Sequence, residues 1–120
     1  MKTILLIEDE AVLGEMYQDK LSQAGLKVIW TKEAEDGLEI IKTKKVDLVI
    51  LDILLPRENG IFFLEKLKKE SKISSVPVVA FSNYDDPETK KHAFALGVKA
   101  YLIKTSYTPK QIVDTIKQYL

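Results

Sequence analysis

Hydrophobic residues along this chain follow two patterns that alternate five times. Short continuous apolar runs without polar alternation are typical of strands buried on both faces of a parallel sheet. Such runs occupy residues 3–7, 28–30, 48–51, 78–81 and 100–103. After each run, apolar residues recur every three or four positions, which indicates amphipathic helices. The expected helices cover residues 13–24, 34–41, 61–70, 87–96 and 109–120.

The expected helix ends carry residues that suit them. Thr31 can cap the second helix, and Asp85 or Asp86 stands before a proline at the start of the fourth. Thr108 precedes a proline at the start of the fifth. Proline at the first helical position loses no hydrogen bond, and a side-chain oxygen before it can accept from free amides. Glycines at positions 25 and 97 are expected to end the first and fourth helices.

Five strands that alternate with five helices predict a (βα)5 fold of the α/β class. Right-handed crossovers then give a doubly wound five-stranded parallel sheet with helices on both faces. The expected strand order is the flavodoxin-like order 2-1-3-4-5. Because 120 residues with 46% hydrophobic content suffice for one core, residues 1–120 are expected to form a single domain.

Composition and charge exclude several classes of function. The chain has 18 basic and 18 acidic residues, so there is no electrostatic reason to expect nucleic acid or an anionic membrane as a partner. The absence of cysteine excludes disulfides, thiolate zinc sites and thiol catalysis. The apolar run before Glu8 is too short for a signal peptide, and no run could span a bilayer. We therefore expect a cytoplasmic protein.

Asp52 ends the third apolar run, at a point where the chain must turn. Pro56 blocks both helix formation and sheet pairing, and Asn59-Gly60 is suited to positive φ. The carboxylate therefore lies at the carboxyl end of a strand, which is where ligands bind in open α/β sheets. Further polar residues hold the same position after other strands: Glu8, Asp9, Ser82 and Lys104.

These side chains together indicate phosphoryl chemistry. Glu8, Asp9 and Asp52 would repel one another at one sheet edge unless a cation lies among them. Oxygen ligands without histidine or cysteine favour Mg²⁺. Lys104 and Ser82 beside that metal would complete a site for a phosphoryl group. The pattern predicts that Asp52 is a nucleophile that forms an aspartyl phosphate.

Over essentially the whole chain, this pattern resembles the receiver domain of two-component response regulators. The resemblance rests on Glu8-Asp9, on Asp52 with Pro56 and Asn59-Gly60 behind it, on Ser82 and on Lys104. It implies that Asp52 is the phosphoacceptor. It also implies that Mg²⁺, or Mn²⁺ in its place, is bound by Asp9, Asp52 and the backbone carbonyl of Leu54, while Glu8 acts mainly through a metal-bound water.

The resemblance further implies the partners and the switch. Ser82 and Lys104 would contact the phosphoryl oxygens, and the ring of Tyr101 would turn inward when Ser82 moves toward the phosphate. The donor would be a sensor histidine kinase or a histidine phosphotransfer protein. Residues 87–120 would bind a downstream protein, or a second copy in a weak dimer. With no DNA-binding or enzymatic segment after Leu120, we expect output through protein contacts, unless the chain is cut from a longer regulator. The resemblance implies a regulatory domain that catalyses only its own phosphotransfer and dephosphorylation.

Three positions depart from the family pattern. Glu8 stands where Asp is frequent, although Glu-Asp is also a common version in the family. Thr105 follows Lys104 where proline is usual and where the bond is commonly cis. A cis bond costs about 0.5–1 kcal/mol before proline but about 2.5–4 kcal/mol before another residue. We therefore expect a trans Lys104–Thr105 bond, and the lysine stem is long enough to bring its amine to the site. Asn83 stands where a small residue is frequent, which would narrow access to the phosphoryl group.

Each of these residues also has a purely structural interpretation. Glu8 and Asp9 could cap the first helix, and Tyr101 could be half-buried core, so it is their joint placement that favours chemistry. A flavodoxin-type electron carrier is disfavoured because the acidic residues after the first strand would repel a flavin phosphate. An Asp-nucleophile phosphatase typically has its nucleophile after the first strand. A receiver that is never phosphorylated and serves as a docking module stays open.

Overall fold

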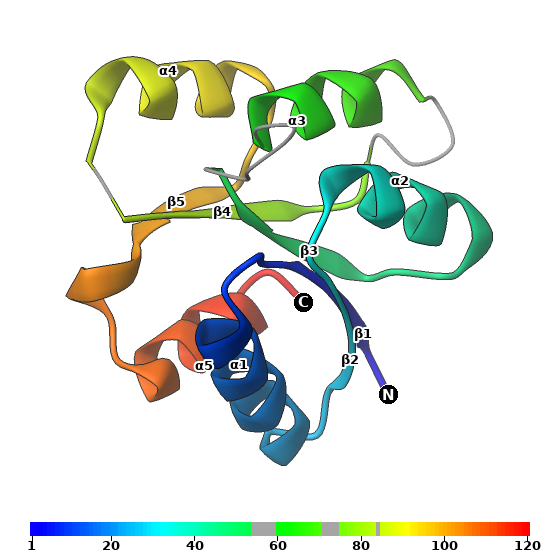
Figure 1. Cartoon of the computed structure of the whole chain (residues 1–120), viewed down its shortest axis with the longest axis vertical. Helices are drawn as coiled ribbons and strands as arrows, with labels where there is room; N and C mark the ends of the chain where they lie inside the picture. Colours follow the sequence, from blue (N-terminus) through cyan, green and yellow to red (C-terminus); the bar gives the residue numbers. More distant parts are fainter. Residues whose placement is uncertain (54–59, 71–74, 84) are drawn as a thin grey trace.

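The computed structural model describes residues 1–53, 60–70, 75–83 and 85–120, and Figure 1 shows how their strands and helices are arranged. Within these ranges the strands are β1 (Thr3–Ile7), β2 (Lys27–Thr31), β3 (Leu48–Asp52), β4 (Val78–Ser82) and β5 (Ala100–Ile103). The helices are α1 (Ala11–Gln23), α2 (Ala34–Thr43), α3 (Gly60–Lys69), α4 (Pro87–Ala95), the 3-10 helix η1 (Lys104–Ser106) and α5 (Pro109–Lys117). The strands form one parallel sheet in the order β2-β1-β3-β4-β5, which confirms the predicted fold.

Helices cover both faces of this sheet. In Figure 1, α1 and α5 lie together on one side of the strands, and α2, α3 and α4 lie on the other. Side chains alternate between the two faces along each strand. Ile4 and Leu6 of β1 accordingly belong to the hydrophobic cluster under α1 and α5, whereas Leu5 and Ile7 belong to the cluster under α2, α3 and α4.

The inner strands are buried along their whole length. Every residue of β3 and β4 is buried, and this is why their sequences are continuous apolar runs instead of alternating ones. Asp52 is the last residue of β3, where it pairs with Phe81, and Ser82 is the last residue of β4. Asp52 and Ser82 thus belong to the strands and not to the loops that follow, so the sheet fixes their backbone.

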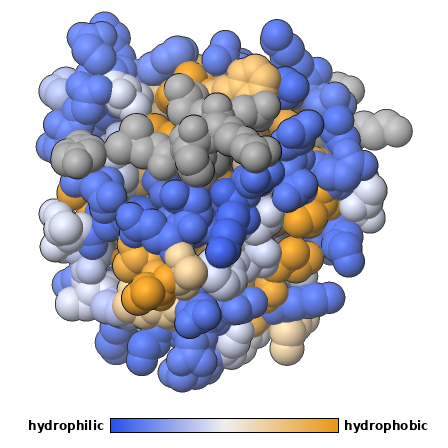
Figure 2. Space-filling model, in the orientation of Figure 1, coloured by the Kyte–Doolittle hydropathy of each residue, from blue (hydrophilic) through white to orange (hydrophobic). Residues whose placement is uncertain are grey.

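The face of the molecule drawn in Figure 2 is largely polar. Hydrophilic residues predominate on it, and hydrophobic residues form small patches between them. In the described part of the chain, the exposed large hydrophobic side chains are Met1, Val12, Phe62, Phe94 and Tyr107. None of the helices in the described ranges is long and apolar enough to cross a membrane.

Several helix ends confirm the predictions. Gly25 and Gly97 have φ values of 87° and 97°, the left-handed conformation that glycine favours after a helix. At the start of α5, the Thr108 hydroxyl accepts from the Gln111 amide, and the Thr108 amide donates to the Gln111 side chain. Asp86 holds the capping position before the proline that begins α4, as predicted, but its side chain makes no cap hydrogen bond and accepts from the Thr89 hydroxyl instead.

The predicted cap of α2 is wrong. Thr31 is the last residue of β2, where it pairs with Ile7, and Glu33 holds the capping position without a side-chain cap bond. The Thr31 hydroxyl accepts from the Glu33 amide instead. Pairing with β1 extends the carboxyl end of β2 by one residue, to Thr31. The local sequence predicts that this threonine is the cap of α2.

Gly60 has a different role from the predicted one. It is the first residue of α3 and lacks the expected positive φ, while Pro56 and Asn59 lie outside the described residues. A Cβ at Gly60 would lie 2.8 Å from the Ile53 Cα and 2.9 Å from the Asp52 carbonyl oxygen. The Gly60 amide also donates to the Ile53 carbonyl at 2.7 Å. Glycine therefore lets α3 begin against the backbone that follows β3.

We predict that Gly60→Ala lowers the free energy of unfolding by about 1–3 kcal/mol, because the added methyl meets backbone atoms that cannot move independently. The matched control is Gly37→Ala in α2. There the new Cβ meets the Cδ1 atom of Ile7 at 2.5 Å, which is the end of a flexible side chain, and alanine gains up to about 1 kcal/mol in helix propensity. Urea unfolding measures both variants, and equal losses would contradict the backbone contact.

Candidate functional site

Three charged side chains meet at the carboxyl edge of the sheet. Glu8 follows β1, Asp52 ends β3 and Lys104 follows β5. The residue two positions before each of them belongs to the cluster under α1 and α5, so continued alternation directs all three toward that side. The Lys104 Nζ donates to Glu8 Oε1 at 2.6 Å and to Asp52 Oδ2 at 3.2 Å. One ammonium thus joins two carboxyl groups from strands far apart in the sequence.

Burial shapes the electrostatics of this trio, because its members are only 1% (Glu8), 5% (Asp52) and 8% (Lys104) exposed. Burial and a hydrogen bond with Glu8 raise the pKa of Asp52 to about 7, although the Lys104 charge acts to lower it. Burial lowers the pKa of Lys104, but the hydrogen bond with Glu8 and the Asp52 charge outweigh it, so the net pKa is raised. The site favours a proton or a second cation near Asp52.

Asp9 brings a third carboxylate to the cluster. It is half-buried beside Glu8, and Glu8, Asp9 and Asp52 each offer an oxygen within 4.8 Å of the others. Carboxylate oxygens gathered this closely suit a small hard cation such as Mg²⁺. These three residues could therefore hold a metal ion. Leu54, whose carbonyl is the remaining ligand expected from the sequence, lies outside the described residues.

Ser82 and Tyr101 lie on β4 and β5 beside this cluster. Tyr101 pairs with Ala80, and both belong to the cluster under α2, α3 and α4, so alternation directs the buried Ser82 toward the same side. The Tyr101 hydroxyl is buried and has no hydrogen-bond partner among the described residues. A buried unpaired hydroxyl costs about 1–3 kcal/mol. Any rearrangement that pairs it is favoured by that amount.

The backbone after β5 confirms the expected peptide geometry. None of the peptide bonds in the described ranges is cis, so the Lys104–Thr105 bond is trans. Lys104 is the first residue of η1, directly after the strand. Its amine reaches both carboxyl groups from this backbone, as the length of the lysine stem predicted.

Two aromatic residues at this site were missed by sequence reasoning. Tyr17 of α1 meets Phe81 edge to face, with ring centroids 5.4 Å apart, and burial raises the pKa of Tyr17. The Trp30 indole nitrogen donates to the Glu8 carbonyl at 2.8 Å. Tyr17 matches an ordinary helix core position and Trp30 an ordinary strand end. No local signal distinguishes them, because their contacts form between elements distant in the sequence.

Comparison with known proteins finds relatives along the whole chain. Residues 4–117 match the family described as the response regulator receiver domain. The uncharacterized transcriptional regulatory protein YbdJ of Bacillus subtilis is 32% identical over 117 residues, which are 98% of this chain and 50% of YbdJ. The phosphate regulon transcriptional regulatory protein PhoB of Escherichia coli is 31% identical, with 97% of this chain and 50% of PhoB covered. The chain spans about half the length of these two relatives.

A relative of matching length and a solved structure extend the comparison. The polar-differentiation response regulator DivK of Brucella anthropi is 25% identical, with 99% of this chain and 96% of DivK covered. The crystal structure of the Vibrio cholerae chemotaxis protein CheY4 superimposes with a TM-score of 0.93 over 100% of this chain and 99% of CheY4. At 22% identity, this likeness supports the fold.

We predict that Asp52→Asn raises the free energy of unfolding of the metal-free protein by about 1–3 kcal/mol near pH 8 and by less near pH 5. Folding raises the pKa of Asp52 from 3.8 to about 7. The folded state therefore binds more protons between these values, and its stability falls as the pH rises through that window. The variant leaves the Glu8–Lys104 pair intact.

Urea unfolding in EDTA at the two pH values measures this effect. Asp85→Asn, which changes an exposed carboxylate, is the matched control and should follow the wild type. A wild-type protein whose pH dependence equals that of Asp52→Asn would contradict the destabilising charge.

Proposed function

The chain belongs to the response regulator receiver domain family, and on this basis we propose that it is a phosphorylation-dependent signalling switch whose phosphoacceptor is Asp52. The observation that carries the proposal is the 3.2 Å contact between the Asp52 carboxyl group and the Lys104 ammonium, inside a buried cluster that also contains Glu8. Asp9 lies at the rim of this cluster. A nucleophile, a fixed positive charge and metal-binding oxygens are thus within reach of one phosphoryl group.

The proposed reaction moves a phosphoryl group from a phosphohistidine of a sensor kinase or phosphotransfer protein. A carboxylate oxygen of Asp52 bonds to phosphorus as the P–N bond breaks, and the electron pair of that bond returns to the imidazole, which takes up a proton. Lys104 stabilises the negative charge on the phosphoryl oxygens, and the Ser82 hydroxyl donates a hydrogen bond to them. Hydrolysis of the aspartyl phosphate ends the signal.

The acidic cluster fits the metal that this chemistry uses. Bound Mg²⁺, with Mn²⁺ as a substitute, supplies positive charge next to the phosphoryl oxygens. Asp9 and Asp52 would hold it directly, with Glu8 farther out and the Leu54 carbonyl as a further ligand. The clustering of carboxylate oxygens within 4.8 Å supports this set for Glu8, Asp9 and Asp52.

The proposed output face consists of α4, β5 and α5. Of the residues in α4, Ala93 alone is buried, so few packing contacts oppose a shift of this helix. Phe94 on α4 is 44% exposed and Tyr107, just before α5, is 36% exposed. Exposed aromatic side chains are common anchors in protein interfaces. A downstream protein, or a second copy in a weak dimer, would bind here.

We predict that acetyl phosphate with Mg²⁺ adds one phosphoryl group to the chain, measured by intact mass, and that Asp52→Asn abolishes the addition. EDTA should abolish it as well, because the carboxylates would repel the anionic donor without the metal. Asp114→Asn, in an exposed i,i+4 pair on α5, should label like the wild type. Equal labelling of Asp52→Asn would contradict the proposed site, and a wild type that never labels would favour the docking module.

We further predict that beryllofluoride, a phosphate mimic, shifts amide resonances from Asp52 outward into residues 87–107. The proposed route is the movement of Ser82 and the turning of Tyr101, whose unpaired hydroxyl gains a partner on the switch. Tyr101→Phe should keep the shifts around Asp52 but reduce those in α4. In the free protein, this variant should be as stable as the wild type or more so, because it removes a buried hydroxyl that has no hydrogen-bond partner within the described ranges. Full shifts in α4 of Tyr101→Phe would contradict the switch.

A further inference from the structure

The backbone of Glu8 is held on both sides by the end of β2. Its amide donates to the Thr31 carbonyl at 3.0 Å, and its carbonyl accepts from the Trp30 indole nitrogen at 2.8 Å. The second bond comes from a side chain, so the ladder between β1 and β2 ends on a tryptophan. Because the peptide group is planar, a fixed Glu8 carbonyl also fixes the direction in which the chain enters Asp9.

The indole ring is itself fixed against α1. A Cβ at Gly14 would lie 2.1 Å from the Trp30 Cζ2 atom and 2.2 Å from its Cε2 atom, so the ring occupies the space where another residue would have a side chain. Glycine inside a helix costs about 0.5–1 kcal/mol relative to alanine. At Gly14, α1 thus has a residue of low helix propensity, and the Trp30 ring packs there. The Lys32 ammonium, 5.9 Å from the ring centroid, adds a cation–π contact.

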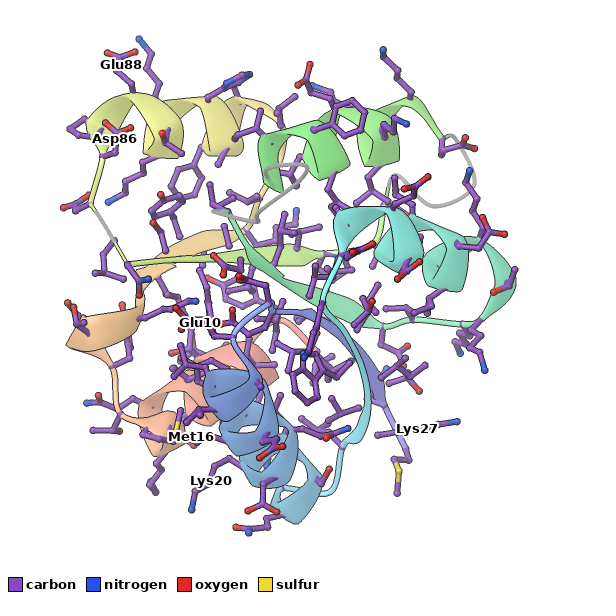
Figure 3. The ribbon with its side chains drawn as sticks, in the orientation of Figure 1. Glu10, Met16, Lys20, Lys27, Asp86 and Glu88 are labelled. Carbon is purple, nitrogen blue, oxygen red and sulfur yellow. The ribbon has the colours of Figure 1, made fainter. Side chains whose placement is uncertain are left out.

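Within the turn itself, the Glu8 side chain accepts one long hydrogen bond, from the Glu10 amide at 3.4 Å. Glu10 stands at the capping position of α1, and its side chain makes no cap hydrogen bond. Figure 3 labels Glu10 where the loop from β1 leads into this helix. Lys104 holds the Glu8 side chain and Thr31 the Glu8 amide, whereas the contact printed for the Glu8 carbonyl in the described part of the chain is the one with Trp30. A residue on β2 orients the loop that carries two of the three clustered carboxylates.

We propose that Trp30 is a positioning residue for the acidic cluster: its indole N–H holds the Glu8–Asp9 peptide so that both carboxylates face a divalent cation. This inference rests on the metal site of the proposed function and adds to it a residue outside the ligand set. Because Trp30 is the chain's one tryptophan, its fluorescence also reports on that peptide. Cation binding changes the emission, since the hydrogen-bonded carbonyl belongs to a residue of the cluster.

The test compares Mg²⁺ affinity by titration calorimetry in the wild type, in Trp30→Phe and in protein with benzothienylalanine in place of its tryptophan. The last replacement keeps the ring shape and has sulfur in place of N–H, so it preserves the packing on Gly14. Loss of one hydrogen bond should weaken Mg²⁺ binding about 3–10-fold in both variants. Lys32→Ala, which leaves the N–H bond untouched, should bind like the wild type. Urea unfolding in EDTA measures the stability of each metal-free variant.

The outcomes separate this inference from the metal site itself. Weaker binding by the benzothienylalanine protein, with an unchanged unfolding midpoint, supports the positioning role, and a Mg²⁺-dependent change in wild-type Trp fluorescence supports the metal site on which it rests. Unchanged affinity with a lowered midpoint would show that Trp30 is merely structural and overturn the inference, while the metal site stands. A wild type that shows neither heat nor fluorescence change with Mg²⁺ would overturn the metal site and the inference together.

Discussion

One buried ammonium, that of Lys104, is the interaction on which this site depends. Its contacts at 2.6 and 3.2 Å neutralise part of the charge of Glu8 and Asp52. Removing the ammonium would leave two buried carboxyl groups without their counter-charge, which typically costs several kcal/mol. The ammonium is nevertheless outnumbered, because Asp9 adds a third carboxyl group. A proton on Asp52, whose pKa is raised to about 7, or a second cation completes the balance. The same shortage of positive charge that destabilises the folded chain makes the cluster receptive to a divalent metal.

The sheet makes this contact possible and explains why a lysine forms it. In the strand order, β4 lies between β5 and β3, and β1 lies beyond β3. Neighbouring strands are about 4.8 Å apart, so Lys104, directly after β5, bridges at least two strand spacings to reach Asp52 and another to reach Glu8. A long, flexible side chain with a compact charge can do this. The strands supply the rigidity that the lysine lacks, since their apolar residues are packed on both faces.

Sequence alone predicted the features of this arrangement that depend on local patterns of apolar and polar residues. Apolar runs identified the strands, and the position of Asp52 and Lys104 at strand ends predicted their meeting, because parallel strands end at one edge. The predictions failed where a distant element decided the outcome. Thr31 pairs with Ile7 and so belongs to the sheet. Position 60 needs glycine because a Cβ there would meet the backbone of Asp52 and Ile53, and not because of a positive φ, which it lacks. The indole bond of Trp30 to Glu8 joins residues 22 positions apart, and no periodicity could predict it.

In the proposed switch, phosphorylation on one side of the sheet has to cause a conformational change on the other side. Glu8, Asp52 and Lys104 are directed toward α1 and α5, whereas Ser82 and Tyr101 are directed toward α2, α3 and α4 by the alternation of their strands. At the end of a strand the backbone no longer separates the two sides, so a hydroxyl in the position of Ser82 can reach across the edge. On the receiving side, α3 buries Phe63, Leu64 and Leu67, while α4 buries Ala93 alone. A shift of Tyr101 is therefore opposed least at α4, and this difference in packing makes α4 the helix best suited to respond.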